Sequence, residues 1–190
     1  MASGVTVAVV GATGAAGQST LRILEERKFP VRELHAFASE RSLGKIVTFR
    51  GEAIRVRKVE AEAFKGVDIA FCSAGSAQSK AFAPMIVRAG ATVVDKSNAF
   101  RMDPNVPLVV PEINPHVARR HQGILASPNC TTIVTVMPLK PLHDAGRLRR
   151  VIATSYQAVS GAGVNGIAEL REQTLAWARG EAIQPRHFPH

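Results

Sequence analysis

The sequence predicts an α/β fold, in which a parallel β-sheet carries helices on both of its faces. Short apolar runs of strand length alternate along the chain with longer stretches of helical periodicity. Most of the strand runs are apolar at consecutive positions, which is typical of strands buried on both faces. Repeated strand–helix–strand units favour a parallel sheet, because parallel neighbours are joined by crossover connections that are usually helical.

The first half of the chain supplies most of these elements. The segment VTVAVV (5–10) reads as a buried strand that runs into glycines, and residues 15–28 place leucines at helical spacing. A helix over 76–90 ends at a glycine, and Pro84 within it predicts a late start or a kink. Strands are expected between these helices at 33–39, 53–59 and 67–75.

The second half continues the alternation. Three further strands are expected at 92–97, 107–112 and 123–128. A long helix is expected from residue 130, followed by a strand over 151–160 and a final helix over 166–179. No internal repeat or low-complexity linker interrupts this pattern.

Length and composition indicate a globular protein of one large or two small domains. The chain has 190 residues, of which 46% are hydrophobic and 21% charged, which is enough to form a core. No apolar run approaches the roughly 20 residues that a membrane span needs, and no signal peptide is recognisable. Two cysteines do not make a disulfide framework, so a cytoplasmic location is expected.

The chain is strongly basic, with a formal net charge of +9 from 24 Lys and Arg against 15 Asp and Glu. Such an excess is compatible with binding to nucleic acid, to anionic membranes or to small molecules that carry phosphate. The basic residues are scattered, and one Trp and one Tyr offer no stacking platform for a nucleic-acid strand. We therefore interpret these charges as solvated surface, with neither nucleic acid nor membrane as a partner.

A glycine-rich motif follows the first predicted strand. Gly11, Gly14 and Gly17 form a G-x-x-G-x-x-G pattern between a strand and an amphipathic helix, the context of a dinucleotide-binding turn. Small residues let backbone N–H groups approach a pyrophosphate, and the start of the helix favours its negative charge. A plain glycine turn is the alternative. The prediction is a Rossmann-type domain that contacts its cofactor through Gly11, Ala12, Thr13, Gly14 and Ala15.

The loop after the second predicted strand, ASERSLGK (38–45), indicates which dinucleotide binds. A site that prefers NAD typically places a carboxylate here for the ribose 2′-hydroxyl. Glu40 competes in this loop with hydroxyl and basic side chains that suit a 2′-phosphate. The residues expected to contact that phosphate are Ser39, Arg41 and Ser42. NADP is therefore the expected cofactor, and a solvated loop is the alternative.

The segment SPNCTT (127–132) places a cysteine where a strand ends and a helix begins. Asn129 can cap that helix, and Cys130 then lies near its first turn. The positive end of the helix dipole favours a thiolate, which can attack a carbonyl carbon. From these residues alone, a catalytic nucleophile and a buried structural cysteine both remain open. Cys72, within an apolar strand, fits the structural role better.

In their order and spacing these segments resemble the aspartate-semialdehyde dehydrogenases. The segments are GATGAAG, ASERSLGK, FCSAGSAQSK, VVDKSNAFRMDPNVPLVVPEIN, SPNCTT and SYQAVSGAG. The resemblance runs from about residue 4 to the C-terminus. Glyceraldehyde-3-phosphate dehydrogenase and N-acetyl-glutamyl-phosphate reductase share the general plan. However, they differ around the cysteine and lack SYQAVSGAG.

The resemblance implies an enzyme that interconverts aspartate 4-semialdehyde, phosphate and NADP⁺ with 4-aspartyl phosphate and NADPH. This step leads to lysine, threonine and methionine. Cys130 would be the nucleophile that carries the acyl group as a thioester, and Gln157 would hold the substrate. Arg101 and Asn129 would bind the phosphate, and Ser160 and Gly161 would contact the cofactor near its nicotinamide. The six histidines show no metal-ligand spacing, so no metal site is expected.

The resemblance also implies a domain organisation. An NADP-binding domain is expected over 1–128, and 129–190 would be the start of an α+β catalytic and dimerisation domain. Members of the family continue past this point and form homodimers or tetramers. The histidine base and the arginine that binds the substrate carboxylate are expected beyond residue 190. His187, His190 and Arg186 do not lie in the motif that carries those roles. We therefore expect poor activity from these residues alone.

Two other functions remain open at this stage. A module that binds NADP without catalysis would share the glycine-rich turn. A basic protein that binds nucleic acid would use the net charge, and its binding would weaken with salt.

Overall fold

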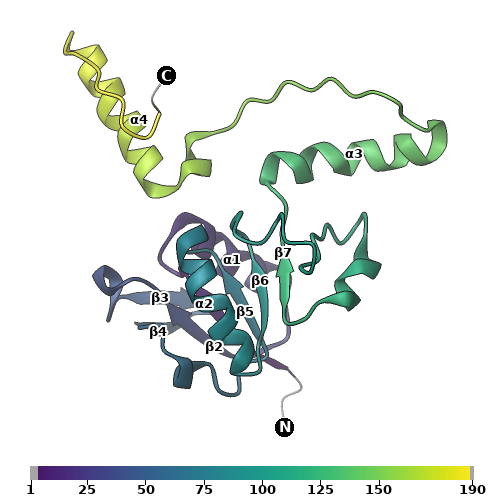
Figure 1. Cartoon of the computed structure of the whole chain (residues 1–190). Helices are drawn as coiled ribbons and strands as arrows, with labels where there is room; N and C mark the ends of the chain where they lie inside the picture. The colour runs from purple at the N-terminus through teal and green to yellow at the C-terminus, as the bar shows by residue number, and fades with distance from the viewer. Residues whose placement is uncertain (1–3, 189–190) are drawn as a thin grey trace. The chain divides into compact units, whose positions relative to one another are not determined.

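The computed structural model describes residues 4–188. The chain divides into two compact units, Met1–Val151 and Ile152–His190. The first unit is built around a β-sheet, and the second around one helix (Figure 1).

The first unit contains a seven-stranded sheet with the order β3-β4-β2-β1-β5-β6-β7. All neighbouring strands are parallel except β3 and β4, which form an antiparallel hairpin at one edge. The strands are β1 (Val5–Val10), β2 (Val31–Phe37), β3 (Ile46–Phe49), β4 (Glu52–Arg57), β5 (Ile69–Cys72), β6 (Thr92–Asp95) and β7 (Ile124–Ala126). The order reverses at β1, so a crevice is expected at the carboxyl ends of β1 and β5.

Helices α1 (Ala15–Glu26) and α2 (Ser76–Arg88) cover opposite faces of this sheet (Figure 1). Side chains on β1 alternate between the two faces, so Val7 and Val9 pack on the α1 side, and Ala8 and Val10 on the α2 side. The predicted α/β class, with a Rossmann-type sheet and helices on both faces, is therefore confirmed.

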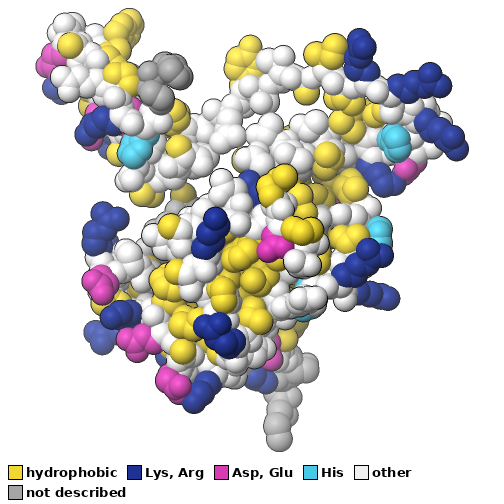
Figure 2. All heavy atoms as spheres, viewed as in Figure 1, with side chains coloured by type: hydrophobic (Ala, Val, Ile, Leu, Met, Phe, Trp, Pro, Cys, Tyr) yellow, Lys and Arg dark blue, Asp and Glu magenta, His cyan; other side chains and the backbone are white. Residues whose placement is uncertain are grey.

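Helix α3 (Cys130–Gly146) follows β7, and α4 (Gly163–Ala178) dominates the second unit. Four short 3₁₀-helices complete the description: η1 (Glu40–Ser42), η2 (Ala61–Phe64), η3 (Pro115–Arg120) and η4 (Val159–Ala162). Both long helices leave large apolar side chains exposed, as the yellow atoms along them in Figure 2 show. No helix within residues 4–188 is long and apolar enough to span a membrane.

Two strand predictions were wrong. Residues 107–112 make only an isolated bridge, between Leu108 and Ala126. Pro107 and Pro111 have no N–H to donate to a ladder, and the side chain of Asn114 bonds the backbone of Leu108 and Val110 instead. Residues 151–160 form no strand, and all but Val159 are exposed, because no other strand pairs with them in the described part of the chain.

Three other elements differ from the prediction or its alternatives. The edge strand β3 was not predicted. Helix α2 starts at Ser76, where the predicted range starts, and continues through Pro84, so the alternative of a late start is wrong. Pro84 is exposed, so water can bond the carbonyl group that its missing N–H leaves without a donor. Helix α4 begins three residues earlier than the predicted 166.

Candidate active site

The glycine-rich turn is packed too closely for side chains at two of its positions. Gly11 has φ +86°, and a Cβ atom there would lie 2.8 Å from the carbonyl oxygen of Ser73. A Cβ on Gly17 would lie only 2.1 Å from the carbonyl oxygen of Gly11. The start of α1 is thereby held against the ends of β1 and β5, with backbone N–H groups at the edge of the sheet. This cradle fits the pyrophosphate of a dinucleotide, which needs close backbone approach.

The turn contacts the loop after β2 through side chains. The hydroxyl of Thr13 donates to the hydroxyl of Ser42 over 3.2 Å, and Ser42 is buried. Ser39 and Arg41 precede it in the chain and are exposed. Lys58 lies 3.7 Å from the Glu40 carboxylate and partly offsets its charge. The turn predicted to bind the pyrophosphate and the loop predicted to bind the 2′-phosphate therefore lie side by side, at the carboxyl ends of β1 and β2.

The loop after β6 is fixed by internal hydrogen bonds. The fully buried carboxylate of Asp95 accepts a hydrogen bond from the Ser97 hydroxyl at 2.8 Å. Arg101 donates from Nε to the carbonyl oxygen of Ser127 at 2.9 Å and from Nη2 to that of Lys96 at 3.2 Å. Arg101 also lines a cavity of about 590 Å³. Its guanidinium therefore connects the loops after β6 and β7, close to the segment that carries the cysteine.

Cys130 is the first residue of α3, and its side chain is exposed. Asn129 caps the helix as predicted: its side-chain oxygen accepts a hydrogen bond from the Thr131 N–H at 2.8 Å. The Cys130 Sγ lies 3.9 Å from the same oxygen. The thiol is thus held at the start of a helix, open to a reactant.

Cys72 has the opposite environment. It is 1% exposed, within β5, and faces α2. Burial, with a smaller effect of the nearby Asp95 carboxylate, raises the pKa of the Cys72 thiol to about 12. A protonated thiol without access to solvent is unreactive, so the predicted structural role of Cys72 is confirmed.

Gln157, Ser160 and Gly161 lie together in the second unit. A Cβ on Gly161 would lie 2.0 Å from Nε2 of Gln157, so the glycine makes room for the amide. Ser160 and Gly161 belong to η4, where the Gly161 N–H donates to the carbonyl oxygen of Ala158 at 3.0 Å. Cys130 belongs to the first unit and Gln157 to the second.

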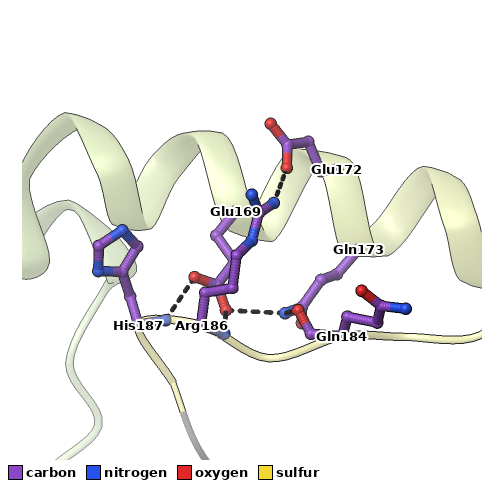
Figure 3. Close-up of polar contacts among 6 residues, drawn as sticks. All are labelled: Glu169, Glu172, Gln173, Gln184, Arg186 and His187. Atoms are coloured by element: carbon purple, nitrogen blue, oxygen red, sulfur yellow. Dashed lines mark hydrogen bonds and ion pairs between the residues drawn. The ribbon is translucent and has the colours of Figure 1, made fainter.

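Glu169, on α4, is a buried acid that the sequence analysis did not identify (Figure 3). Its carboxylate accepts hydrogen bonds from the backbone N–H groups of Arg186 at 2.8 Å and His187 at 2.6 Å, and from the Gln173 amide at 2.8 Å. The backbone hydrogen bonds, led by that of Arg186, lower the pKa of Glu169, although its desolvation opposes them. The side chain of Arg186 pairs with Glu172.

The Glu169 contacts place the segment 186–188 against the start of α4. A Cβ on Gly166 would lie 2.9 Å from the Val159 carbonyl oxygen and 3.2 Å from the Phe188 ring. The one feature of the sequence that could have indicated this contact is the spacing of Glu169, which lies three residues after Gly166 and therefore on the same face of the helix. Within residues 4–188, no group of His, Cys, Asp and Glu could hold a metal ion. His190 lies outside the described residues.

Comparison with protein families gives two matches along the chain. Residues 6–121 match the model of the semialdehyde dehydrogenase NAD binding domain. Residues 139–190 match the model of the semialdehyde dehydrogenase dimerisation domain.

Curated relatives are named aspartate-semialdehyde dehydrogenase. The protein of Aquifex aeolicus is 50% identical over 98% of this chain and 56% of its own length. That of Bacillus subtilis is 49% identical over 100% of this chain and 55% of its own length. The chain therefore spans about half the length of these relatives.

Solved structures agree. Aspartate semialdehyde dehydrogenase II of Vibrio cholerae, complexed with ASA, has a TM-score of 0.92 at 43% identity, over 98% of this chain and 56% of its own. The enzyme of Candida albicans, solved with NADP, has a TM-score of 0.64 at 28% identity, over 76% of this chain and 48% of its own. The two matched domains, this sheet and these relatives together show that the chain belongs to the semialdehyde dehydrogenase family.

Proposed function

We propose that the chain is part of an NADP-dependent aspartate-semialdehyde dehydrogenase. The observation that carries this proposal is the position of Cys130, exposed at the start of α3 and capped by Asn129, in a chain with a dinucleotide-type glycine turn. In this proposal, residues 1–128 form the domain that binds the cofactor, and residues 129–190 form the start of the catalytic and dimerisation domain. The protein acts in the cytoplasm, as a homodimer or tetramer, on the route to lysine, threonine and methionine.

The chemistry begins with the Cys130 sulfur. As a thiolate it adds to the aldehyde carbon of aspartate semialdehyde and forms a C–S bond, while the C=O π electron pair moves to the oxygen and gives a thiohemiacetal oxyanion. When hydride leaves that carbon, the oxyanion re-forms the C=O bond and a thioester results. Bound NADP⁺ supplies the acceptor for this hydride. An oxygen of inorganic phosphate then attacks the thioester carbon, and the C–S bond breaks to release the thiolate and aspartyl phosphate.

Other residues position the reactants. The Gln157 amide can orient the substrate carbonyl without changing its own charge, and Gly161 leaves space for it. Asn129 and Arg101 would bind the phosphate, and the Arg101 guanidinium already has two of its donors on backbone carbonyl groups. An arginine fork matches the tetrahedral oxygens of phosphate.

Cofactor contacts are assigned to three segments. The turn at Gly11, Ala12, Thr13, Gly14 and Ala15 binds the pyrophosphate, Ser39, Arg41 and Ser42 bind the 2′-phosphate, and Ser160 and Gly161 lie near the nicotinamide. The contact between Thr13 and Ser42 supports this assignment, because it joins the first two segments.

Titration with NADPH and NADH, followed by nicotinamide fluorescence, tests the cofactor assignment. We expect saturable binding of NADPH, at least tenfold tighter than that of NADH.

A turnover assay tests the chemistry, in the protein that carries the rest of the catalytic domain. Aspartate semialdehyde should reduce NADP⁺ in a phosphate-dependent reaction that is lost in Cys130→Ser. Binding of NADPH without any such turnover would favour the alternative, a module that binds cofactor but does not catalyse.

A further inference from the structure

Two polar side chains with no assigned role follow the ends of β5 and β6. The register pairs Cys72 of β5 with Asp95 of β6, so Ser73 and Lys96 are the next residues on the two strands. The ladder extends to both of them: the Ser73 N–H donates to the Val10 carbonyl oxygen at 2.8 Å, and the Lys96 N–H to that of Cys72 at 3.0 Å. Ser73 and Lys96 are therefore neighbours across the carboxyl edge of the sheet.

Both side chains lie on the α1 side of the sheet. The Lys96 ammonium donates to the hydroxyl of Thr20, on α1, at 3.0 Å. Phe71 packs against the core beneath α1, whereas Cys72 belongs to the core beneath α2. Because side chains alternate along a strand, Ser73 returns to the α1 side.

Lys96 is a cation without an acid beside it. The residue as a whole is exposed, so a ligand can reach it, while partial desolvation of the ammonium lowers its pKa. Within residues 4–188, no carboxylate lies within ion-pair distance of it, and its one hydrogen bond goes to the neutral Thr20 hydroxyl. That hydroxyl donates its own hydrogen to the Ala16 carbonyl oxygen at 2.8 Å, so it can act only as an acceptor for Lys96. An ammonium has three donors, and an anion nearby would satisfy both its charge and its remaining donors.

Ser73 supplies the second, independent observation. Its hydroxyl oxygen is buried and has no hydrogen-bond partner among the described residues. A buried hydroxyl without a partner is unfavourable, and buried polar groups are usually bonded to protein, water or ligand. The carbonyl group of Ser73 lies against Gly11, so this residue is next to the glycine-rich turn.

We propose that Lys96 and Ser73 form an anion-binding subsite that holds the pyrophosphate of the dinucleotide from the β5–β6 side, opposite the glycine-rich turn. The exposed ammonium donates to a phosphate oxygen, and the Ser73 side chain turns so that its hydroxyl, which is buried without ligand, donates to another. This inference rests on the proposed cofactor site and adds two residues to it.

Two pairs of variants test the subsite by NADPH titration of the 190-residue chain. Lys96→Met removes the ammonium, and Lys65→Met removes an exposed ammonium from the loop before β5 as its control. Ser73→Ala removes the hydroxyl, and Ser79→Ala removes another buried hydroxyl without a partner, on α2. We expect Kd to rise about tenfold in Lys96→Met and about threefold or more in Ser73→Ala, as for the loss of charged and neutral hydrogen bonds. In both control variants, the Kd for NADPH should stay within about twofold of that of the unaltered chain.

Stability and labelling complete the test. Because the Ser73 hydroxyl has no partner without ligand, Ser73→Ala should weaken NADPH binding while the unfolding midpoint stays the same or rises. In the unaltered chain, NADPH should slow acetylation of Lys96 and leave that of Lys65 unchanged, as read by peptide mass spectrometry. This labelling result also decides the matter if Lys96→Met does not fold.

Two outcomes overturn the inference in different ways. If the unaltered chain binds NADPH, and Ser73→Ala binds it equally well with no protection of Lys96, the subsite is wrong and the cofactor site stands. If the unaltered, folded chain binds no NADPH, the proposed cofactor function fails and the subsite fails with it.

Discussion

The side-chain oxygen of Asn129 accepts the backbone N–H of Thr131 at 2.8 Å and so fixes the first turn of α3, in which Cys130 lies between them. Asparagine at this position satisfies one of the donors that every helix start leaves open. The geometry of the proposed nucleophile thus depends on its neighbour, and the cap and the thiol form one structural unit.

Asn129→Ala should therefore loosen the turn that carries Cys130. Loss of such a cap costs about 1 kcal/mol of helix stability. We expect faster amide hydrogen exchange at residues 131–133, whereas Asn129→Asp, which caps equally well, should keep the exchange slow. Equal exchange rates in Asn129→Ala and the unaltered chain would show that the cap does not hold the turn.

The two cysteines should differ sharply in reactivity. Iodoacetamide at neutral pH should modify Cys130, which is exposed, and leave Cys72, which is buried and has its pKa raised to about 12. Peptide mass spectrometry gives the two rates separately, and urea should make Cys72 reactive by exposing it. Modification of Cys72 at the rate of Cys130 in the folded chain would contradict the structure of β5.

Gly17→Ala should destabilise the first unit. The new Cβ would lie 2.1 Å from the Gly11 carbonyl oxygen and 2.8 Å from the Ala12 Cα, both backbone atoms that cannot rotate away. Overpacking of this kind costs about 1–3 kcal/mol or more, measurable by urea denaturation. Gly146→Ala is the control, because no atom outside its own chain neighbours and helix backbone lies within 4 Å of its Cβ position. A Gly17→Ala protein as stable as that control would rule out the close approach of α1 to the turn.

Local signals in the sequence predicted the elements whose hydrogen bonds are local. The glycine-rich turn, α1 and the Asn129 cap all depend on residues within a few positions of one another. The two wrongly predicted strands would have needed a neighbouring strand for their hydrogen bonds. In 107–112, two prolines lack the N–H that a ladder needs and Asn114 bonds the backbone instead; 151–160 has no strand beside it in the described part of the chain. Strand pairing is a long-range property that the composition of one segment does not determine.

The missed site residues have the same explanation. The hydrogen bond between Lys96 and Thr20 joins residues 76 positions apart in the sequence, and that between Glu169 and His187 joins residues 18 positions apart. Neither pair has a spacing that a motif would reveal. Cys130 is indicated by its position at the start of a helix, whereas Arg101 and Gln157 are indicated only by resemblance to residues of a family, and the catalytic roles of all three stay predictions.

Arg41→Ala should change cofactor preference. If Arg41 contacts the 2′-phosphate, its loss removes a charge-assisted hydrogen bond that NADPH makes and NADH does not, so NADPH affinity should fall about tenfold or more while NADH affinity is unchanged. Arg27→Ala removes an exposed arginine after α1 and should alter neither. An equal loss of affinity for both nucleotides would place Arg41 elsewhere in the site.

The Glu169 carboxylate should make the second unit sensitive to acid. Backbone hydrogen bonds from Arg186 and His187 lower its pKa in the folded chain below the ordinary value of 4.5. A depressed carboxyl pKa contributes stability that is fully present above the unfolded pKa and is lost as the pH falls through the folded one. The segment 186–188 should therefore detach from α4 in acid, and Trp177, the only tryptophan, reports on that helix.

Glu169→Gln separates this effect from general acid unfolding. The variant should be less stable than the unaltered chain at pH 7. The difference should begin to shrink below about pH 4.5, where the acid becomes neutral in the unfolded chain, and should vanish once the pH falls below its lowered pKa in the folded chain. Glu172→Gln, which removes the exposed partner of the Arg186 side chain, should cost much less, because exposed ion pairs contribute little. A Glu169→Gln deficit that persists unchanged to pH 3 would mean that the shape of the side chain, and not its charge, holds the segment in place.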